Sequence, residues 1–167
     1  MAWSGSSMFR EFLRTSMGGA GASNNTLSGS YAGLGADTIK AALFDNTITP
    51  TKDAARTASG YGSGVWASGG VSHANWPAAG QTLSSKTLTV PSTGVMRFDA
   101  ADTAGAGTLT IANAYGALVY DDTTVLTGTD VADQGICFNY FGGAQSVTGG
   151  TFTIVWSANG IFEVTAA

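Results

Sequence analysis

A strictly alternating segment in the last part of the chain constrains the fold more than any other feature. From Thr151 to Trp156, large apolar residues occupy every second position, with Thr and Val between them. A period of two is typical of a β-strand with one buried face. Ser157-Ala158-Asn159-Gly160 follows, and then a second apolar stretch from Ile161 to Thr165. The pattern predicts two strands joined by a tight turn.

The length of this turn follows from the side chains that it would bring together. A three-residue loop, Ala158-Asn159-Gly160, pairs Trp156 with Phe162. The same register pairs Ile154 with Val164, whereas a two- or four-residue loop splits the apolar set between the two faces. It also places Gly160 where a type I turn with a bulge needs a left-handed residue. We therefore expect a C-terminal hairpin that is the centre of stability.

The same rule predicts a second hairpin from residues 86–90 and 95–98. A three-residue loop, Ser92-Thr93-Gly94, pairs Val90 with Met96 and Leu88 with Phe98. Residues 107–112 predict a weaker strand. Residues 115–120 are apolar on both faces, as in a central strand. About eight short strands separated by glycine-rich turns are typical of an all-β domain, a single β-sandwich or barrel.

The N-terminal part of the chain has a different pattern. Residues 6–17 predict a short amphipathic helix, because apolar side chains recur at three- and four-residue spacing. These side chains are Met8, Phe9, Phe12, Leu13 and Met17. Residues 18–36 are rich in Gly, Ala, Ser and Asn, a composition typical of flexible segments. We expect two parts: residues 1–36 as a helix and arm, and residues 37–167 as the β domain. The arm is either a loose terminus or carries the helix to a neighbouring subunit.

Composition excludes several classes of function. The 167 residues carry a formal net charge of −4, and only 11% are charged. Nucleic-acid binding is not expected, because it needs a basic stripe. Residues 1–20 contain no continuous apolar core, so we expect neither a signal peptide nor a membrane span. We expect the chain to be made and to fold in a cytoplasm. The single Cys137 lies in an aromatic run, which favours a buried, inert thiol over a nucleophile.

No pattern of catalytic or metal-binding residues emerges. His73 is the only histidine and lies beside Asn75 and Trp76, which favours a hydrogen-bonded loop residue over a catalytic base. Most aspartates of the second half flank Thr or Ala at predicted strand ends, where this side chain usually bonds local amides. The whole set of these aspartates is Asp99, Asp102, Asp121, Asp122, Asp130 and Asp133. We expect no enzyme activity, no cofactor and no metal.

Several segments resemble a group of small structural proteins of tailed bacteriophages, especially those of actinobacteria. The similarity is strongest in Tyr115-Gly116 and Leu118-Val119-Tyr120-Asp121-Asp122. The other matching segments are Met1-Ala2-Trp3-Ser4, Phe9-Arg10-Glu11-Phe12, residues 36–44, Ile48-Thr49-Pro50, Trp76-Pro77-Ala78-Ala79-Gly80, Asp133-Gln134-Gly135, Phe141-Gly142-Gly143 and Asn159-Gly160-Ile161-Phe162. Residues 91–107 resemble the group least.

The resemblance implies a virion component, most directly a head decoration or minor capsid protein. Its expected partners are the major capsid protein and other copies of the chain, with Met8, Phe9, Phe12, Leu13 and Met17 as the expected contact residues. No catalytic residue is carried over. Two alternatives stay open: a tail structural protein, and a carbohydrate-binding module that presents Trp66 or Trp76 to glycans.

Overall fold

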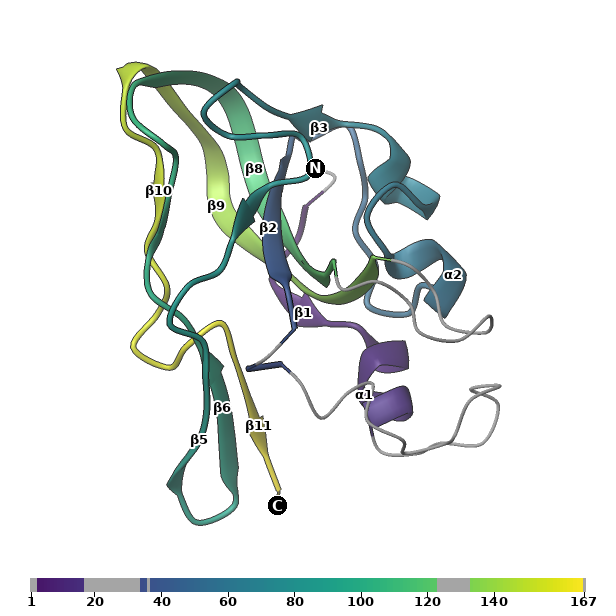
Figure 1. Cartoon of the computed structure of the whole chain (residues 1–167). Coiled ribbons are helices and arrows are strands. Elements are labelled where there is room, and N and C mark those ends of the chain that lie inside the picture. Colours follow the sequence, from purple (N-terminus) through teal and green to yellow (C-terminus); the bar gives the residue numbers. More distant parts are fainter. Residues whose placement is uncertain (1–2, 17–33, 36, 123–132, 167) are drawn as a thin grey trace.

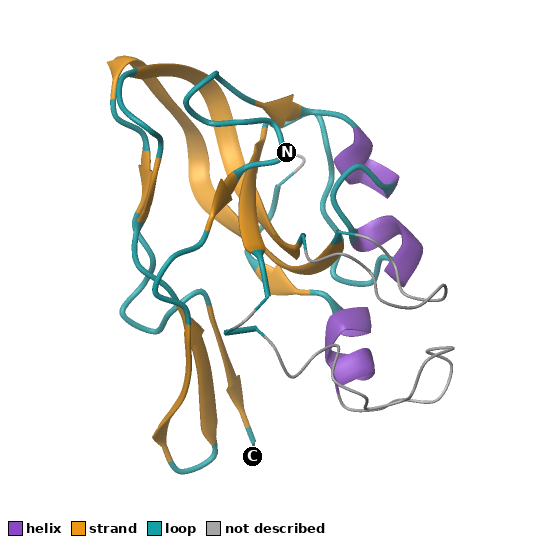
Figure 2. Cartoon of the chain, viewed as in Figure 1, coloured by secondary structure: helices purple, strands orange, loops and turns teal. Residues whose placement is uncertain are grey.

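The structure is a computed structural model that describes residues 3–16, 34–35, 37–122 and 133–166. Strands dominate it, with three short helical segments (Figure 2). Several sheets pack together without closing into a barrel. The predicted all-β, sandwich-like class is therefore confirmed, together with a short N-terminal helix.

The largest sheet contains six antiparallel strands, in the order β1-β9-β8-β2-β3, with β4 paired to β2. Its strands are β1 (Ser7–Met8), β2 (Ile39–Phe44), β3 (Gly70–Val71), β4 (Gln81–Thr82), β8 (Leu109–Asp121) and β9 (Gln134–Gly150). Two smaller sheets follow the orders β10-β7 and β11-β6-β5. Their strands are β5 (Thr87–Ser92), β6 (Val95–Asp99), β7 (Thr103–Ala104), β10 (Thr153–Ile154) and β11 (Phe162–Thr165).

The two longest strands differ from the expected short ones. β8 joins the predicted strands 107–112 and 115–120 into one strand of 13 residues. β9 runs on through Gly142 and Gly143 to reach 17 residues. The β8–β9 ladder accommodates this run through several register shifts. The central position predicted for residues 115–120 is confirmed, since β8 lies between β2 and β9 and residues 117–120 are fully buried.

Helices lie on one side of the large sheet, β7 and β10 lie on the other side, and the sheet of β5, β6 and β11 extends below it (Figure 1). The helical segments are α1 (Arg10–Ser16), α2 (Arg56–Ser59) and the 3-10 helix η1 (Gly64–Ala67). Trp66 of η1 packs edge-on against Phe44 and Phe9, with ring centroids 5.0 and 6.1 Å apart. Trp3 lies over Gly116, where a Cβ atom would overlap its indole ring. These aromatic rings fill the core on the helical face.

Residues 3–16 belong to this core, which corrects the expectation of a helix separate from the β domain; the predicted flexible segment 18–36 lies outside the described residues except for residues 34–35. Trp3 and Phe9 are 1% and 0% exposed, and β1 pairs with β9 through Ser7↔Phe138 and Met8↔Cys137. The predicted boundary at residue 36 therefore does not hold for residues 3–16, which pack as part of the β domain. The helix starts at Arg10 and not at the predicted residue 6, because residues 7–8 form strand β1.

The predicted C-terminal hairpin is wrong, although its local features are right. Phe152 and Ile154 are buried and Val155 is exposed, as the alternation requires, and Gly160 has the expected positive φ of 75°. However, β10 pairs with β7 and β11 pairs with β6. Ser157 and Gly160 form an isolated bridge around two residues, so this turn carries the chain from one sheet to another. The pattern fixed which side chains share a face but not which strand lies opposite.

The second predicted hairpin forms, but its predicted three-residue loop is wrong. β5 pairs with β6, and Leu88 faces Phe98 as expected. Ser92 faces Val95, so the loop has two residues, and the register shifts between Thr89 and Ser92. Pro91 lies in this shifted part, where its missing N–H costs no ladder hydrogen bond.

Candidate partner-binding surface

The sheet of β5, β6 and β11 presents an apolar face. Cross-strand partners in an antiparallel sheet point to the same side. Leu88, Phe98 and Phe162 form one such row, and Met96 and Val164 form the next. These five apolar side chains therefore share one face of the sheet.

This face is buried near the body and exposed toward the β5–β6 turn. Phe98 is fully buried, and its ring centroid lies 5.4 Å from that of Phe162. Phe162 in turn contacts Phe12 of α1, with centroids 6.2 Å apart. Leu88, in the same row but on the outer strand β5, is 50% exposed, and Met96, in the row nearer the turn, is 39% exposed. The β5–β6 hairpin forms the lower end of the molecule in Figure 1.

β5 is the most exposed strand of this sheet. All six of its residues are exposed, and Val90 reaches 74%. Among the described residues, the exposed large hydrophobic side chains are Leu88, Val90, Met96 and Val155, three of which belong to this one sheet. Exposed apolar side chains that cluster in this way mark a contact surface more often than scattered single residues do. We call Leu88, Val90 and Met96 the β5–β6 patch.

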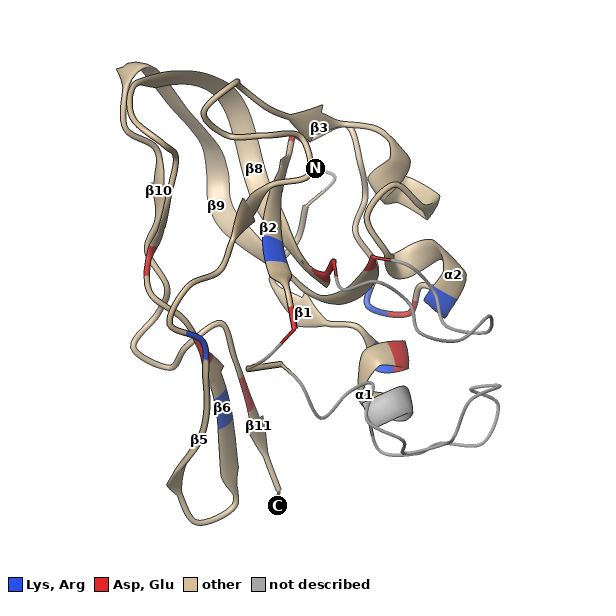
Figure 3. Ribbon diagram, viewed as in Figure 1, with Lys and Arg blue, Asp and Glu red and all other residues tan. Residues whose placement is uncertain are grey.

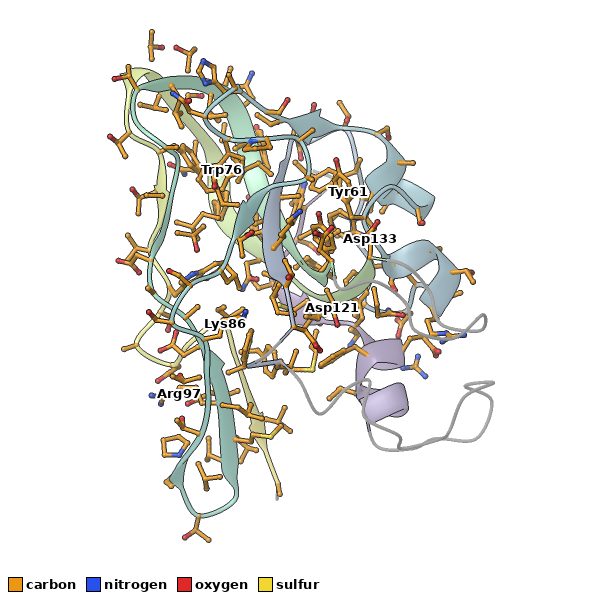
Figure 4. The ribbon with its side chains drawn as sticks, viewed as in Figure 1. Tyr61, Trp76, Lys86, Arg97, Asp121 and Asp133 are labelled. Atoms are coloured by element: carbon orange, nitrogen blue, oxygen red, sulfur yellow. The ribbon has the colours of Figure 1, made fainter. Side chains whose placement is uncertain are left out.

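The opposite face of the same sheet is polar. Arg97 of β6 lies beside Glu163 of β11, with Nη2 2.7 Å from the carboxylate oxygen Oε1. Figure 4 labels Arg97 on this sheet, and Figure 3 shows β5 itself free of charged residues. The sheet thus has one polar face and one apolar face, and the described part of the chain leaves the apolar face partly uncovered.

A groove lies between β9 and the segment around β10. Its volume is about 430 Å³. It is lined by Tyr140, Phe141, Gln145, Phe152, Thr153, Ile154 and Val155. None of these lining residues is charged, and the aromatic and aliphatic side chains stand beside hydroxyl and amide groups.

The contact residues predicted from the N-terminal pattern are placed differently. Phe9 and Phe12 are 0% and 5% exposed in the core of their own chain, so they are not available to a partner in this conformation. Met8 and Leu13 are half-buried, and Met17 lies outside the described residues. The apolar spacing does indicate a helix with one buried face, but that face packs against the β domain of the same molecule and not against a partner.

The two tryptophans considered for glycan binding are also buried. Trp66 is 2% and Trp76 0% exposed, and Trp76 packs edge-on against Phe152. A sugar-binding platform needs an open aromatic face. The carbohydrate-binding alternative therefore loses the residues on which it rested.

Carboxylates gather where β8 ends and β9 begins, near Asp121 and Asp133 in Figure 4. Burial raises the pKa of Asp133, and the neighbouring charge and hydrogen bond of Asp122 raise it further. Lys40 opposes this repulsion, with its Nζ 2.6 Å from Oδ2 of Asp122. Burial, with the charge of Asp121, also raises the pKa of Asp37. The cluster lies where the start of β2, the end of β8 and the start of β9 meet.

The remaining candidate groups make local structural contacts. His73 accepts a hydrogen bond from the backbone N–H of Asn75 through Nδ1, 3.1 Å away, which agrees with the predicted loop role. Asp99 accepts one from the N–H of Ala100 at 2.8 Å. Cys137 is buried as predicted, and burial raises the pKa of its thiol. Within the described ranges, no three His, Cys, Asp or Glu side chains are grouped to hold a metal ion.

The sequence missed the β5–β6 patch because alternation alone does not say whether an apolar face is covered. One signal was present: an uncharged strand, Thr87 to Val90, ended by Pro91, which is common at sheet edges. In the described part of the chain, no helix is long and apolar enough to cross a membrane. No protein-family model, curated protein or solved structure matches the chain.

Proposed function

We propose that this protein is a structural component of a tailed-bacteriophage virion and acts as a head decoration protein. In this role it binds the assembled shell of the major capsid protein and stabilises it by adding contacts between neighbours. The observation that carries the proposal is the β5–β6 patch, a partly uncovered apolar surface at one end of a weakly charged β domain. The sequence resemblance to small phage structural proteins supplies the particular role.

The size of the patch supports a repetitive partner better than a single one. Fully burying an aliphatic side chain contributes about 2 kcal/mol. Weighted by the exposed fractions of Leu88, Val90 and Met96, the patch offers about 3 kcal/mol. Association costs at least about 4 kcal/mol in lost freedom of motion, so the patch alone gives weak binding. On a shell, several weak contacts at once raise the effective concentration of each.

Heads that lack the protein provide the direct test. Heads from a phage with the gene deleted should take up purified protein to saturation in co-sedimentation, and should then resist heat better. Leu88→Lys, at a position that is 50% exposed, should lower occupancy. Ala67→Lys adds the same charge on the exposed side of η1 and should leave occupancy unchanged. No uptake by heads, or equal uptake by both variants, contradicts the proposal.

The tail alternative makes a different prediction. A tail-tube or baseplate subunit forms closed rings of fixed size in solution without heads. Sedimentation of the purified protein at low concentration separates this reading from head decoration, because rings of fixed size persist on dilution and weak self-association does not. The position of the gene, beside capsid genes or among tail genes, also separates them.

A further inference from the structure

One edge of β10 faces away from its own sheet. β10 pairs with β7, and the described residues place no strand on its other side. The N–H of Gly105 donates to the carbonyl of Phe152, 3.0 Å away. Because hydrogen-bonded pairs alternate in an antiparallel ladder, Ile154 bonds β7, while Thr153 and Val155 direct their backbone groups to the opposite side.

The groove described above runs along this edge. Four successive residues, Phe152 to Val155, line it, whereas a groove on a strand face is lined by alternate residues. Tyr140, Phe141 and Gln145 of β9 form its other wall. The groove therefore combines outward backbone donors and acceptors with an apolar wall, the combination that binds an added β-strand.

The same chain carries a strand with matching properties. β5 pairs only with β6 among the described residues, so its outer edge is unpaired. Residues 87–92 contain no charge, and neither do residues 141–155. Natural proteins usually protect such edges with charged side chains. Here the protection is a proline at one end, Pro91, which leaves residues 87–90 able to pair.

We propose that β5 of one copy pairs with the free edge of β10 in a second copy, with Leu88 and Val90 entering the groove. A second copy fits because both surfaces are uncharged: the net charge of −4 lies elsewhere and is not brought together by this contact. A charged partner strand would lose its hydration without compensation. The two surfaces differ, so the contact is head-to-tail and links copies into chains or rings.

The inference rests on the proposed function for where the contact forms, since neighbouring copies on a shell meet at high local concentration. It assigns Leu88 and Val90 of the β5–β6 patch to a second copy of the chain and not to the major capsid protein. The test itself needs no heads. Sedimentation velocity of the wild-type protein up to about 1 mM should show self-association that increases with concentration. Val90→Lys and Val155→Lys place a charge in the contact at side chains that are 74% and 72% exposed, so folding is preserved. Each should weaken self-association at least about tenfold, whereas Ala67→Lys should not.

Mixing the two variants distinguishes this contact from a symmetric one. Val90→Lys keeps an intact groove and Val155→Lys keeps an intact β5, so a mixture should form dimers and nothing larger. A wild-type protein that stays monomeric at every concentration overturns the inference, as does a mixture that forms no dimers. If self-association is observed but heads take up no protein, the head proposal fails and the contact stands. If heads bind the protein through Leu88 but the protein stays monomeric in solution, the contact between copies is overturned and the head proposal is supported.

Discussion

Replacing Phe9 by alanine tests whether the N-terminal segment is part of the core. The Phe9 ring is 0% exposed and packs against Phe138 and Trp66, with centroids 5.5 and 6.1 Å away. It lies against the backbone at Gly135, where an added Cβ would be 2.7 Å from its Cε2 atom. Backbone on one side and large rings on the other leave little that can move into the space.

The expected cost follows from this confinement. Phe→Ala substitutions in protein cores cost about 3–5 kcal/mol, and sites that cannot collapse lie at the upper end. For a domain of this size, each kcal/mol lowers the melting temperature by about 2–4 °C. Phe9→Ala should therefore melt about 8–20 °C below the wild-type protein.

Thermal unfolding followed by circular dichroism measures the effect, and urea unfolding gives the free energy. Leu13→Ala is the matched control, because Leu13 lies one helical turn further on and is only half-buried. It should cost about 1 kcal/mol. Equal melting temperatures for Phe9→Ala and the wild-type protein would refute the placement of this segment and restore the separate arm.

Three further predictions concern the turn, the carboxylates and the thiol. Gly160→Ala should lower the free energy of unfolding by more than about 2 kcal/mol, because the new Cβ lies 2.5 Å from the carbonyl oxygen of Phe98 and the φ of 75° is strained. Gly142→Ala, with a φ of 80° but no atom within 4 Å, should cost about 1 kcal/mol, and equal costs in urea melts would contradict the reasoning. The raised folded-state pKa of Asp133 means that its contribution to stability is greatest below its ordinary value of 3.8 and is lost as pH rises through the raised pKa. Asp133→Asn, which suits the positive φ of 54°, should match the wild type in acid and exceed it at neutral pH by up to about 1 kcal/mol, since solvent screens the effect; a variant that is less stable at neutral pH refutes this. Because burial raises the pKa of the Cys137 thiol, Ellman's reagent should label it only as fast as the protein unfolds, and rapid labelling of folded protein would contradict its burial.

Local patterns predicted local structure well. The period of two gave the buried positions Phe152 and Ile154, and Gly160 was recognised as a left-handed residue. The β5–β6 hairpin was found with Leu88 opposite Phe98. These features depend on side-chain alternation and turn chemistry, which neighbouring residues carry in their own sequence.

Side-chain alternation and turn chemistry could not predict which strands, distant in the sequence, pair with each other. β11 could pair with β10 or with β6 by apolar pattern alone, and the structure places Phe162 against Phe98. The spacing of Phe9 and Phe12 likewise showed an apolar helix face but not which body it covers. For the candidate surface, the sequence showed that Leu88 and Val90 share a face. Only the fold shows that no described part of the chain fully covers them.

A three-dimensional reconstruction of the virion tests the central claim most directly. The account predicts density for this domain on the outer surface of the head, with the β5–β6 patch of Leu88, Val90 and Met96 buried in contacts with neighbouring subunits. A domain located in the tail, or a domain on the head whose patch faces solvent, would contradict it.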